Sequence, residues 1–279
     1  MATEKPTGTK EWAPISKNIQ MGCDNGDSCI YCYARARALR FKQIPDRGVW
    51  NRPVVNQKQL NERPKKLNGR IFFPSSHDIT PRNIDAVVPY LERWLSVGNE
   101  FLIVSKPHLA CIKVLCEELE PYKGQILFRF TIGATGLLRS LEFWEPGVPG
   151  FNERLASLSM AHGMGYDTSV SSEPFLDGTI YSLVRLCEPY VTDAHWVGKM
   201  NKMETRVAFR GVSFRDAGKN PSLWTGDEWL RWNMVKNSQT DDKIKELYEM
   251  FKHNPKIKYK DSIKEILGLP MPKGIGLDV

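Results

Sequence analysis

Short apolar segments recur along the chain in a pattern that suits buried strands. The first three, Arg70–Pro74, Phe101–Ser105 and Ile126–Gly133, consist largely of isoleucine, leucine, valine and phenylalanine. Two later segments, Tyr166–Pro174 and Tyr190–Gly198, mix β-branched and aromatic residues with serine. Short runs of this composition, bounded by turn-forming residues, are typical of strands. We therefore predict five strands in this part of the chain.

Segments with helical character separate these strands. One of them contains Pro89 but is otherwise helical in pattern, and another ends at Gly165, a residue type that commonly stops helices. Strands that alternate with helices form parallel β–α–β units. The predicted fold class is therefore α/β, with the sheet closed or partly closed into a barrel. The predicted helices are Arg82–Val97, Ala110–Leu119, Asn152–Gly165 and Thr179–Pro189.

The two ends of the chain extend this pattern differently. An N-terminal strand that leads into Cys23 and a helix over Tyr33–Phe41 would form the first β–α unit. Near the other end, Asp241–Lys252 and Asp261–Leu267 have amphipathic patterns and are joined by a basic linker. We expect these two helices to pack on the outside of the barrel or to cover one of its ends.

The composition is that of an ordinary globular protein. Hydrophobic residues make up 41% of the 279 residues and charged residues 25%, which is enough apolar material for a sizeable core. No run approaches the roughly 18 apolar residues of a membrane span, and the first residues lack the apolar centre of a signal peptide. We expect a cytoplasmic protein with no membrane partner. In a reducing compartment, clustered cysteines are more often metal ligands or catalytic thiols than disulfides.

Positive charge is concentrated in one segment. The chain has a formal net charge of +7, and residues 33–70 contain eleven Lys and Arg against two acidic residues. Such a cluster suits a polyanion, so DNA or a nucleotide is a candidate partner. In that case Arg35, Arg37 and Arg40 would face phosphate groups. A helix face and a loop that simply face water would account for the charge equally well.

Three of the six cysteines, Cys23, Cys29 and Cys32, stand within ten residues in a C-x5-C-x2-C pattern. They could hold a structural zinc ion if His77 or His195 supplied the fourth ligand. They could also form part of an iron–sulfur site, which normally uses four thiolates. Three thiolates on a four-iron cluster leave one iron open, and an open iron can bind and activate a small molecule. The pattern therefore leaves two kinds of metal site open.

In this pattern the chain resembles the radical SAM superfamily. Its members carry three closely spaced cysteines on a loop after the first strand of a partial (β/α)6 barrel, and S-adenosyl-L-methionine chelates the fourth iron of their [4Fe–4S] cluster. The commonest family spacing is C-x3-C-x2-C; here the first gap, Asp24 to Ser28, has two more residues and the second gap is the same. Tyr31, directly before Cys32, stands where the family places an aromatic residue against the adenine.

The resemblance extends to the spore photoproduct lyase branch and its phage and bacterial relatives. Similar segments follow in the same order over about Gly22 to Lys199: FFPSSHDITP, SKPH, FRFTIG, WEPGVPGFNERLASL and TSVSSEPFLDG. The resemblance implies a partial (β/α)6 TIM-type barrel with additional C-terminal helices. The barrel domain would span residues 1–210 and carry the cluster loop at 22–33. A helical extension over residues 211–279 would pack on the barrel.

The resemblance also implies which residues bind the cofactors. Cys23, Cys29 and Cys32 would bind the cluster, and Tyr31 would face the adenine. In such barrels functional groups collect at the carboxyl ends of the strands. There Lys106 would neutralise the methionine carboxylate, while hydroxyl and carboxylate side chains would contact the carboxylate or the ribose. The residues that would line S-adenosylmethionine are Ser76, Lys106, Thr131 and Glu173.

One departure from the lyase branch concerns the reaction. The lyase has a cysteine near the end of its second strand that returns a hydrogen atom to the product radical, and Ser75 stands at that position here. A serine O–H bond is too strong for this role, so we expect a reaction other than simple thymine-dimer repair. His77 and Asp78 follow at the same rim and are candidates to orient substrate or to relay a proton. A structural turn at Asp78 is the alternative.

The resemblance implies a radical SAM enzyme that reductively cleaves S-adenosylmethionine to a 5′-deoxyadenosyl radical, which takes a hydrogen atom from the substrate. The branch and the basic segment together indicate a nucleic-acid base, such as a modified thymine in DNA, as the group that is rearranged or modified. Flavodoxin or ferredoxin would supply the electron. A peptide or a small metabolite is the alternative substrate. The alternative of another class is a zinc-stabilised nucleic-acid-binding protein without catalysis.

Overall fold

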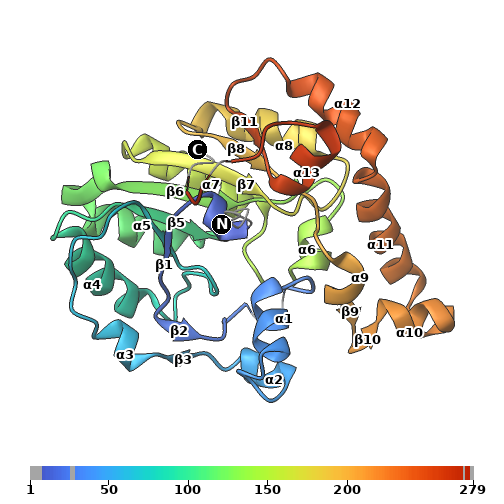
Figure 1. Cartoon of the computed structure of the whole chain (residues 1–279), viewed down its shortest axis with the longest axis horizontal. Coiled ribbons are helices and arrows are strands. Elements are labelled where there is room, and N and C mark those ends of the chain that lie inside the picture. The colour runs from blue at the N-terminus through green and yellow to red at the C-terminus, as the bar shows by residue number, and fades with distance from the viewer. Residues whose placement is uncertain (1–7, 26–28, 273, 277–279) are drawn as a thin grey trace.

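The main sheet has seven strands, all parallel (Figure 1). The computed structural model describes residues 8–25, 29–272 and 274–276. The strand order is β1-β4-β5-β6-β7-β8-β11, so the order in space follows the order in the chain. The strands are β1 (Ile15–Ser16), β4 (Ile71–Phe73), β5 (Phe101–Ser105), β6 (Ile126–Thr131), β7 (Asp167–Ser172), β8 (His195–Val197) and β11 (Ile257–Tyr259).

Helices cover one face of this sheet. When strand order follows chain order, right-handed crossovers return on the same side each time. The core on this side joins Phe128 of β6 to Leu115, Leu158 and Leu183, one from each of three covering helices. We call it the helix-covered face. Its helices are α4 (Ile84–Leu95), α5 (Leu109–Glu118), α7 (Phe151–Gly163) and α8 (Ile180–Cys187).

The opposite face, which we call the inner face, carries a smaller apolar cluster. Phe72, Leu102, Leu127 and Trp196 contribute to it from four different strands. The N-terminal segment covers part of this face: the Trp12 ring stacks on Phe72, with centroids 6.0 Å apart, and meets Trp196 edge-on at 5.6 Å. The N-terminal segment therefore replaces the missing helix layer over part of the inner face.

These elements confirm the α/β pattern that the sequence predicts. Each predicted strand and helix is present, and the largest difference is at the last strand. There the 3-10 helix η3 (Glu188–Tyr190) continues α8, so β8 is shorter than predicted. The sheet has one strand more than the six of the expected barrel. Within the described residues β1 and β11 each have one neighbour, so closure of the sheet into a barrel is not observed.

The predicted strand before Cys23 exists but lies outside the main sheet. It is β2 (Gln20–Met21), which pairs antiparallel with β3 (Val54–Val55). Gly22 follows with φ +89°, and a Cβ atom there would lie 2.6 Å from the carbonyl oxygen of Trp50. Only glycine fits this turn, and the turn directs the chain away from β2 into the cysteine loop.

A small N-terminal lobe surrounds this hairpin (Figure 1). It comprises β2, β3 and the helices α1 (Tyr33–Arg40) and α2 (Arg47–Trp50), and α3 (Gln57–Leu60) follows it. Its core is a separate cluster that contains Cys23, Ala38 and Trp50, with Cys32 packed against it. Two of the three clustered cysteines therefore belong to the lobe.

The C-terminal tail contributes to the sheet as well as to its cover. The predicted helices α12 (Asp241–Phe251) and α13 (Asp261–Leu267) are present, and residues of both join the core on the helix-covered face. The basic linker between them, however, forms β11, which pairs with β8. Ile257 and Tyr259 are buried while Lys258 between them is only half-buried, an alternation typical of a strand. The tail is thus an integral part of the sheet.

A second core, rich in aromatic residues, lies beside the sheet. Trp144, Phe209, Trp224 and Trp232 form it together with smaller side chains. Its elements are α6 (Ser140–Trp144), α9 (Met203–Arg206), β9 (Ala208–Phe209), β10 (Val212–Ser213), α10 (Phe214–Lys219) and α11 (Gly226–Ser238). The remaining 3-10 helices are η1 (Gly8–Glu11), η2 (Glu120–Gln125) and η4 (Pro221–Leu223).

The expected domains also include residues 1–7, 26–28, 273 and 277–279, which lie outside the described residues. Of the helices that are described, none has the combination of length and apolar composition needed to cross a bilayer.

Candidate functional site

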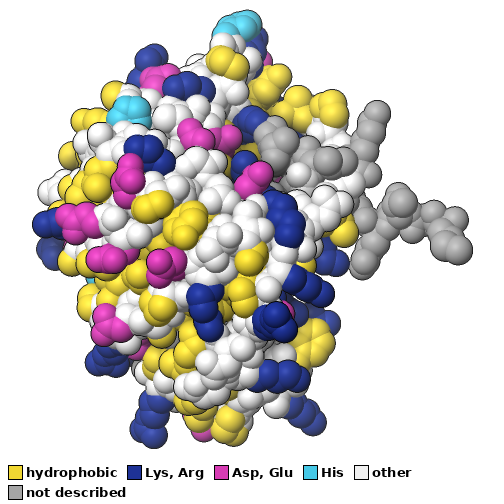
Figure 2. Space-filling model, turned by 90° about the vertical axis from the view of Figure 1, so that its left-hand side faces the viewer, with side chains coloured by type: hydrophobic (Ala, Val, Ile, Leu, Met, Phe, Trp, Pro, Cys, Tyr) yellow, Lys and Arg dark blue, Asp and Glu magenta, His cyan; other side chains and the backbone are white. Residues whose placement is uncertain are grey.

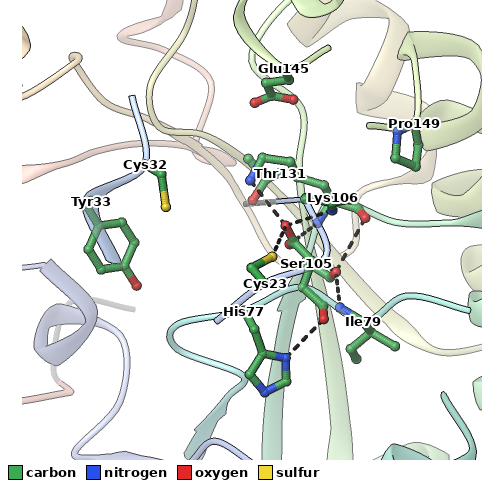
Figure 3. A network of polar contacts seen from close by, with 12 residues as sticks. Cys23, Cys32, Tyr33, His77, Ile79, Ser105, Lys106, Thr131, Glu145 and Pro149 are labelled. Atoms are coloured by element: carbon green, nitrogen blue, oxygen red, sulfur yellow. Dashed lines mark hydrogen bonds and ion pairs between the residues drawn. The ribbon is translucent and has the colours of Figure 1, made fainter. Parts of the chain in front are cut away.

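The predicted cofactor residues gather at the carboxyl edge of the sheet. Side chains of a strand alternate between its two faces, and Leu102 and Leu127 lie on the inner face. Lys106, just after β5, and Thr131, at the end of β6, therefore fall on the inner face too. Lys106 lies close enough to Cys23 of the cysteine loop for its charge to act on the thiol, and Figure 3 shows Thr131 in the same view. The loop and these two strand ends form the candidate site.

The three cysteines of the loop are free thiols. Cys23 and Cys29 are buried and Cys32 is half-buried. The Cys23 N–H donates to the carbonyl oxygen of Trp50 at 3.0 Å, and the Cys32 sulfur accepts the N–H of Arg35 at 3.4 Å, which caps the start of α1. Burial raises the pKa of Cys23 to about 12, and the nearby carboxylate of Asp78 acts in the same direction.

Arg35 belongs to this loop rather than to the outer surface. Its guanidinium donates to the carbonyl oxygens of Cys29, at 3.1 Å, and Ile30, at 3.3 Å. The expectation that Arg35 faces a phosphate is therefore wrong, because its side chain is buried on the side of α1 that faces the loop. Arg37 and Arg40 are exposed. Residues 26–28, in the gap between the first two cysteines, lie outside the described residues.

Asp78 is the centre of a buried polar network that joins the loop to β5. Its Oδ1 accepts the backbone N–H of Lys106 at 2.8 Å and the hydroxyl of Ser105 at 3.2 Å. Its Oδ2 accepts the amide of Asn25 at 3.2 Å and lies 3.4 Å from the Lys106 Nζ and 4.0 Å from the Cys23 sulfur. Asp78 is also a candidate for orienting substrate or relaying protons; the contacts of its carboxylate are with the loop and the strand end.

Opposite charges keep this network ionised. Burial alone would raise the pKa of Asp78, but the charge and the backbone N–H of Lys106 hold it below its usual value. Burial alone would lower the pKa of Lys106, but Asp78, Cys29 and Glu145 raise it well above its usual value. Lys106 therefore provides a fixed positive charge next to the cysteines.

A second buried network holds the other side of the loop. The Tyr31 hydroxyl donates to Glu145 Oε1, and Glu145 Oε2 pairs with Arg154. Arg154 also donates to the carbonyl oxygens of Pro149, at 2.6 Å, and Thr131, at 3.0 Å. Both members of the Glu145–Arg154 pair are completely buried. The pair thereby connects the cysteine loop to the end of β6.

Ser75 and Ser76 lie in the turn after β4 and are held by one side chain. Asn18 Oδ1 accepts the backbone N–H groups of Ser75 and Ser76, at 2.8 and 2.9 Å, and its amide donates to the Ser75 hydroxyl at 2.8 Å. The Tyr33 hydroxyl donates to the Ser75 carbonyl oxygen. Asn18, between β1 and β2, was not singled out from the sequence, because an isolated asparagine there carries no distinctive signal.

Glu173 extends the candidate site toward the C-terminal tail. It follows β7, and its carboxylate lies 3.6 Å from the Nζ of Lys260. Lys260 is completely buried, pairs with Glu11 at 3.0 Å and lies 4.0 Å from the centroid of the Trp12 ring. Burial raises the pKa of Glu173, and the charge of Lys260 opposes that rise. Three distant parts of the chain therefore meet at one buried lysine.

The two histidines that the sequence offers as a fourth zinc ligand, His77 and His195, have other partners in the structure. The Nδ1 of His77 lies 3.0 Å from the carbonyl oxygen of Asp78, and its ring packs edge-on against Phe73 in the large core. The His195 Nε2 lies 2.8 Å from the Ser172 hydroxyl. Since Trp196, next to it in β8, lies on the inner face, His195 points to the helix-covered face. Among the described residues, neither ring is grouped with the three thiols as a metal ligand.

His195 gives a prediction about stability and pH. Burial lowers its pKa to about 3 from an ordinary value of 6.5. Between these values the unfolded chain binds one more proton at this site than the folded chain, so the free energy of unfolding falls as the pH falls. We expect a loss of about 1.4 kcal/mol per pH unit from this residue. Urea unfolding of wild type and His195→Gln at several pH values between 7 and 5 measures it. Parallel curves for the two proteins would contradict the prediction.

Arg129 alternates with Phe128 and Phe130 in the sequence, which predicts an arginine inside the barrel that pairs with Glu173 or with a bound carboxylate or phosphate; the structure gives it another partner. Its guanidinium pairs with Asp193 at 2.9 Å and donates to the Ser169 hydroxyl at 2.9 Å. It also lies 4.6 Å from the centroid of Trp12. Asp193 comes before β8 rather than at its end, so it lies toward the amino edge of the sheet. The Arg129–Asp193 pair is therefore not part of the candidate site.

The sequence pattern did not predict several residues that build the site, or it predicted another role for them. Lys260 and Glu11 gave no signal, although recognising Ile257–Tyr259 as a strand would have placed Lys260 at a strand end. From their places in the sequence, Glu145 and Arg154 indicate only helix-capping and structural roles; in the structure they form the buried pair behind Tyr31. Asn25 lies between the first two cysteines, where a loop asparagine is common.

The described residues contain no group of three or more His, Cys, Asp or Glu side chains placed to share one metal ion. A four-iron cluster binds its ligands through separate iron atoms, so it does not require such a group. Comparison of the chain with protein-family models, with curated proteins and with solved structures found no match.

Proposed function

We propose that the protein is a radical SAM enzyme that acts on a nucleic-acid base. The observation that carries the proposal is the position of the three-cysteine loop, which lies at the carboxyl edge of an all-parallel sheet beside Lys106. Enzymes with parallel sheets bind their ligands at this edge. When bound, a [4Fe–4S] cluster and S-adenosylmethionine would supply a 5′-deoxyadenosyl radical that takes a hydrogen atom from the substrate.

The donor set fits an iron–sulfur cluster with one open position. Cys23, Cys29 and Cys32 would bind it, and three thiolates are one fewer than a fully ligated cluster uses. Burial disfavours the thiolate form of Cys23 and Cys29 in the free protein. A bound metal reverses that preference, because a coordinating thiol is deprotonated. The positive charge of Lys106 further offsets the negative charge of the thiolates.

Lys106 and Glu173 provide opposite charges at the same edge. Asp78 occupies one direction around the Lys106 ammonium, which has three donors, so the ammonium retains donors for a carboxylate. The Glu173 side chain is 23% exposed and can accept hydrogen bonds from amino or hydroxyl groups. S-adenosylmethionine carries a carboxylate, an amino group and a ribose diol. Lys106 therefore matches the carboxylate of S-adenosylmethionine, and Glu173 matches its amino group or its ribose hydroxyls.

Tyr31 would contribute its ring rather than its hydroxyl. The hydroxyl donates to Glu145, whose second oxygen is paired with Arg154. These bonds fix the direction of the Tyr31 ring, and Tyr31 stands between Cys29 and Cys32 in the sequence. A fixed aromatic face next to the cysteines suits stacking on an adenine.

The nucleic-acid substrate is supported by the basic segment that follows the cysteines, since α1 begins directly after Cys32. Flavodoxin or ferredoxin would be the electron donor. A peptide or small-metabolite substrate is the alternative within the same chemistry.

Anaerobic reconstitution tests the proposal. The protein is incubated with iron and sulfide, reduced with dithionite and supplied with S-adenosylmethionine, and the products are separated by chromatography. We expect a brown protein that forms 5′-deoxyadenosine and methionine, and no 5′-deoxyadenosine when dithionite is omitted. A colourless protein that retains zinc and forms no 5′-deoxyadenosine would instead indicate a zinc-stabilised nucleic-acid-binding protein.

A further inference from the structure

One side of α1 leads from the cysteine loop out to the surface of the N-terminal lobe. Tyr33, Arg37, Arg40 and Phe41 are spaced i, i+4, i+7 and i+8, which places them on the same side of a helix. All four are exposed, whereas the opposite side of α1 is buried against the lobe. We call these four residues the α1 stripe. It begins at the site, because the Tyr33 hydroxyl donates to the Ser75 carbonyl oxygen.

The stripe combines aromatic rings with guanidinium groups. Tyr33 is 44% exposed and Phe41 61% exposed, although large aromatic side chains usually bury most of their surface. The Arg40 guanidinium lies 5.6 Å from the centroid of the Phe41 ring. Rings and guanidinium planes are the groups on which proteins stack the bases of single-stranded nucleic acids.

The segment that contains the stripe is strongly basic. Residues 33–70 contain only two acidic residues, Asp46 and Glu62, and Glu62 pairs with Lys17 at 2.6 Å. Figure 2 shows Lys and Arg side chains gathered toward the lower right of that view, and acidic side chains mostly toward its left. The positive charge of this segment is therefore largely uncompensated by acidic residues of its own, and it complements a chain of phosphates.

We propose that the α1 stripe binds a single-stranded nucleic-acid segment, with a base stacked on Phe41 and phosphates at Arg37 and Arg40. This inference deepens the proposed function. Binding of the strand does not require the radical chemistry, but the reaction of a bound base at the cysteine loop rests on the proposed function. The eight residues of α1 span about 12 Å. A strand along the stripe therefore reaches from the lobe surface to the cysteine loop.

The exposed rings favour a single strand over a duplex. In a duplex the faces of the bases are stacked on one another, and a surface ring reaches them only after a base is flipped out. In a single strand every base offers a flat face. An acidic protein would also complement the positive charge, but it has no row of flat bases for Phe41 and Tyr33.

Fluorescence anisotropy with a short labelled oligothymidylate tests the inference on the full chain. We expect Phe41→Ala to weaken binding on the order of tenfold, because stacking on one aromatic ring contributes about that much. We expect the Arg37→Gln/Arg40→Gln double variant to bind more weakly, with a log–log salt slope shallower by about 1.4, since a single strand releases about 0.7 counterion per phosphate. Matched controls on distant surfaces are Met250→Ala, which truncates an exposed apolar residue, and Lys113→Gln/Lys123→Gln, which removes two exposed charges.

Four results would overturn the inference: no binding by wild type, unchanged binding by Phe41→Ala, equal affinity for the complementary duplex, or equal displacement by polyglutamate. The last would identify the stripe as a docking surface for an acidic protein. Formation of 5′-deoxyadenosine is measured in parallel. If it forms without strand binding, the proposed chemistry stands and the stripe assignment fails; if the strand binds and no 5′-deoxyadenosine forms, the reverse holds.

Discussion

We expect the Cys32→Ala variant to retain no iron–sulfur cluster after reconstitution and to form no 5′-deoxyadenosine. With Cys23 and Cys29 alone, two irons rather than one would lack a protein ligand. The sulfur of Cys32 also caps α1 by accepting the N–H of Arg35, and loss of a cap costs only about 1 kcal/mol. The folded protein should therefore persist while its iron is lost. Iron and sulfide analysis and the visible absorption of the reconstituted protein measure the effect.

Cys111→Ala is the matched control for this variant. Cys111 is buried in α5 and packs in the core on the helix-covered face, away from the loop. Its truncation removes a thiol without touching the candidate site, and we expect full iron content and normal 5′-deoxyadenosine formation. Full retention of iron by Cys32→Ala would contradict the assignment of Cys32 as a ligand.

The second large effect is expected at the Glu145–Arg154 pair. Removing one partner of a completely buried ion pair leaves an uncompensated charge and typically costs about 3–5 kcal/mol. Glu145→Ala should therefore lower the free energy of unfolding by this amount, because Arg154 has no exposed surface. The variant also removes the acceptor for the Tyr31 hydroxyl, so reconstitution should give less iron. Denaturant unfolding and iron analysis measure the two effects.

Two further variants separate the charge from the packing. Glu117→Ala breaks an exposed pair with Lys113, and such a change is expected to stay within about 0.5 kcal/mol. In Glu145→Leu/Arg154→Met both charges are replaced by apolar groups, which should recover most of the lost stability. A loss below about 1 kcal/mol in Glu145→Ala would show that this pair does not stabilise the fold as the burial of its members indicates.

Much of the main sheet was predictable because β4, β5 and most of β6 are apolar on both faces. Phe101–Ser105 is a case in which the predicted and observed strands coincide, since every residue of the run is buried or half-buried. The position of Lys106 and Thr131 followed from the same pattern: once the strands are parallel, their carboxyl ends share an edge. The clustering of the cysteines was also predictable, because Cys23, Cys29 and Cys32 lie within ten residues of one another in the sequence.

Other features depend on contacts between segments that are far apart in the chain. β11 has only three residues, too few for a pattern to distinguish it from a linker. The partner of Arg129 is Asp193 rather than Glu173 because the register of the strands decides which carboxylate lies within reach. Asn18 and Lys260 likewise acquire their contacts only when the strands are assembled. In each case the sequence shows the residue but does not show which distant residue it contacts.

The contact between Lys260 and Glu11 has a consequence for how the protein is made. These residues lie near opposite ends of the described chain, and β11 directly precedes Lys260. During synthesis, the N-terminal segment leaves the ribosome long before Lys260 does. The last strand of the sheet and the ion pair to Glu11 can form only after Lys260 has emerged. Since domains fold as units, the final arrangement of the inner face is reached only after the segment with β11 and Lys260 has been made, rather than strand by strand.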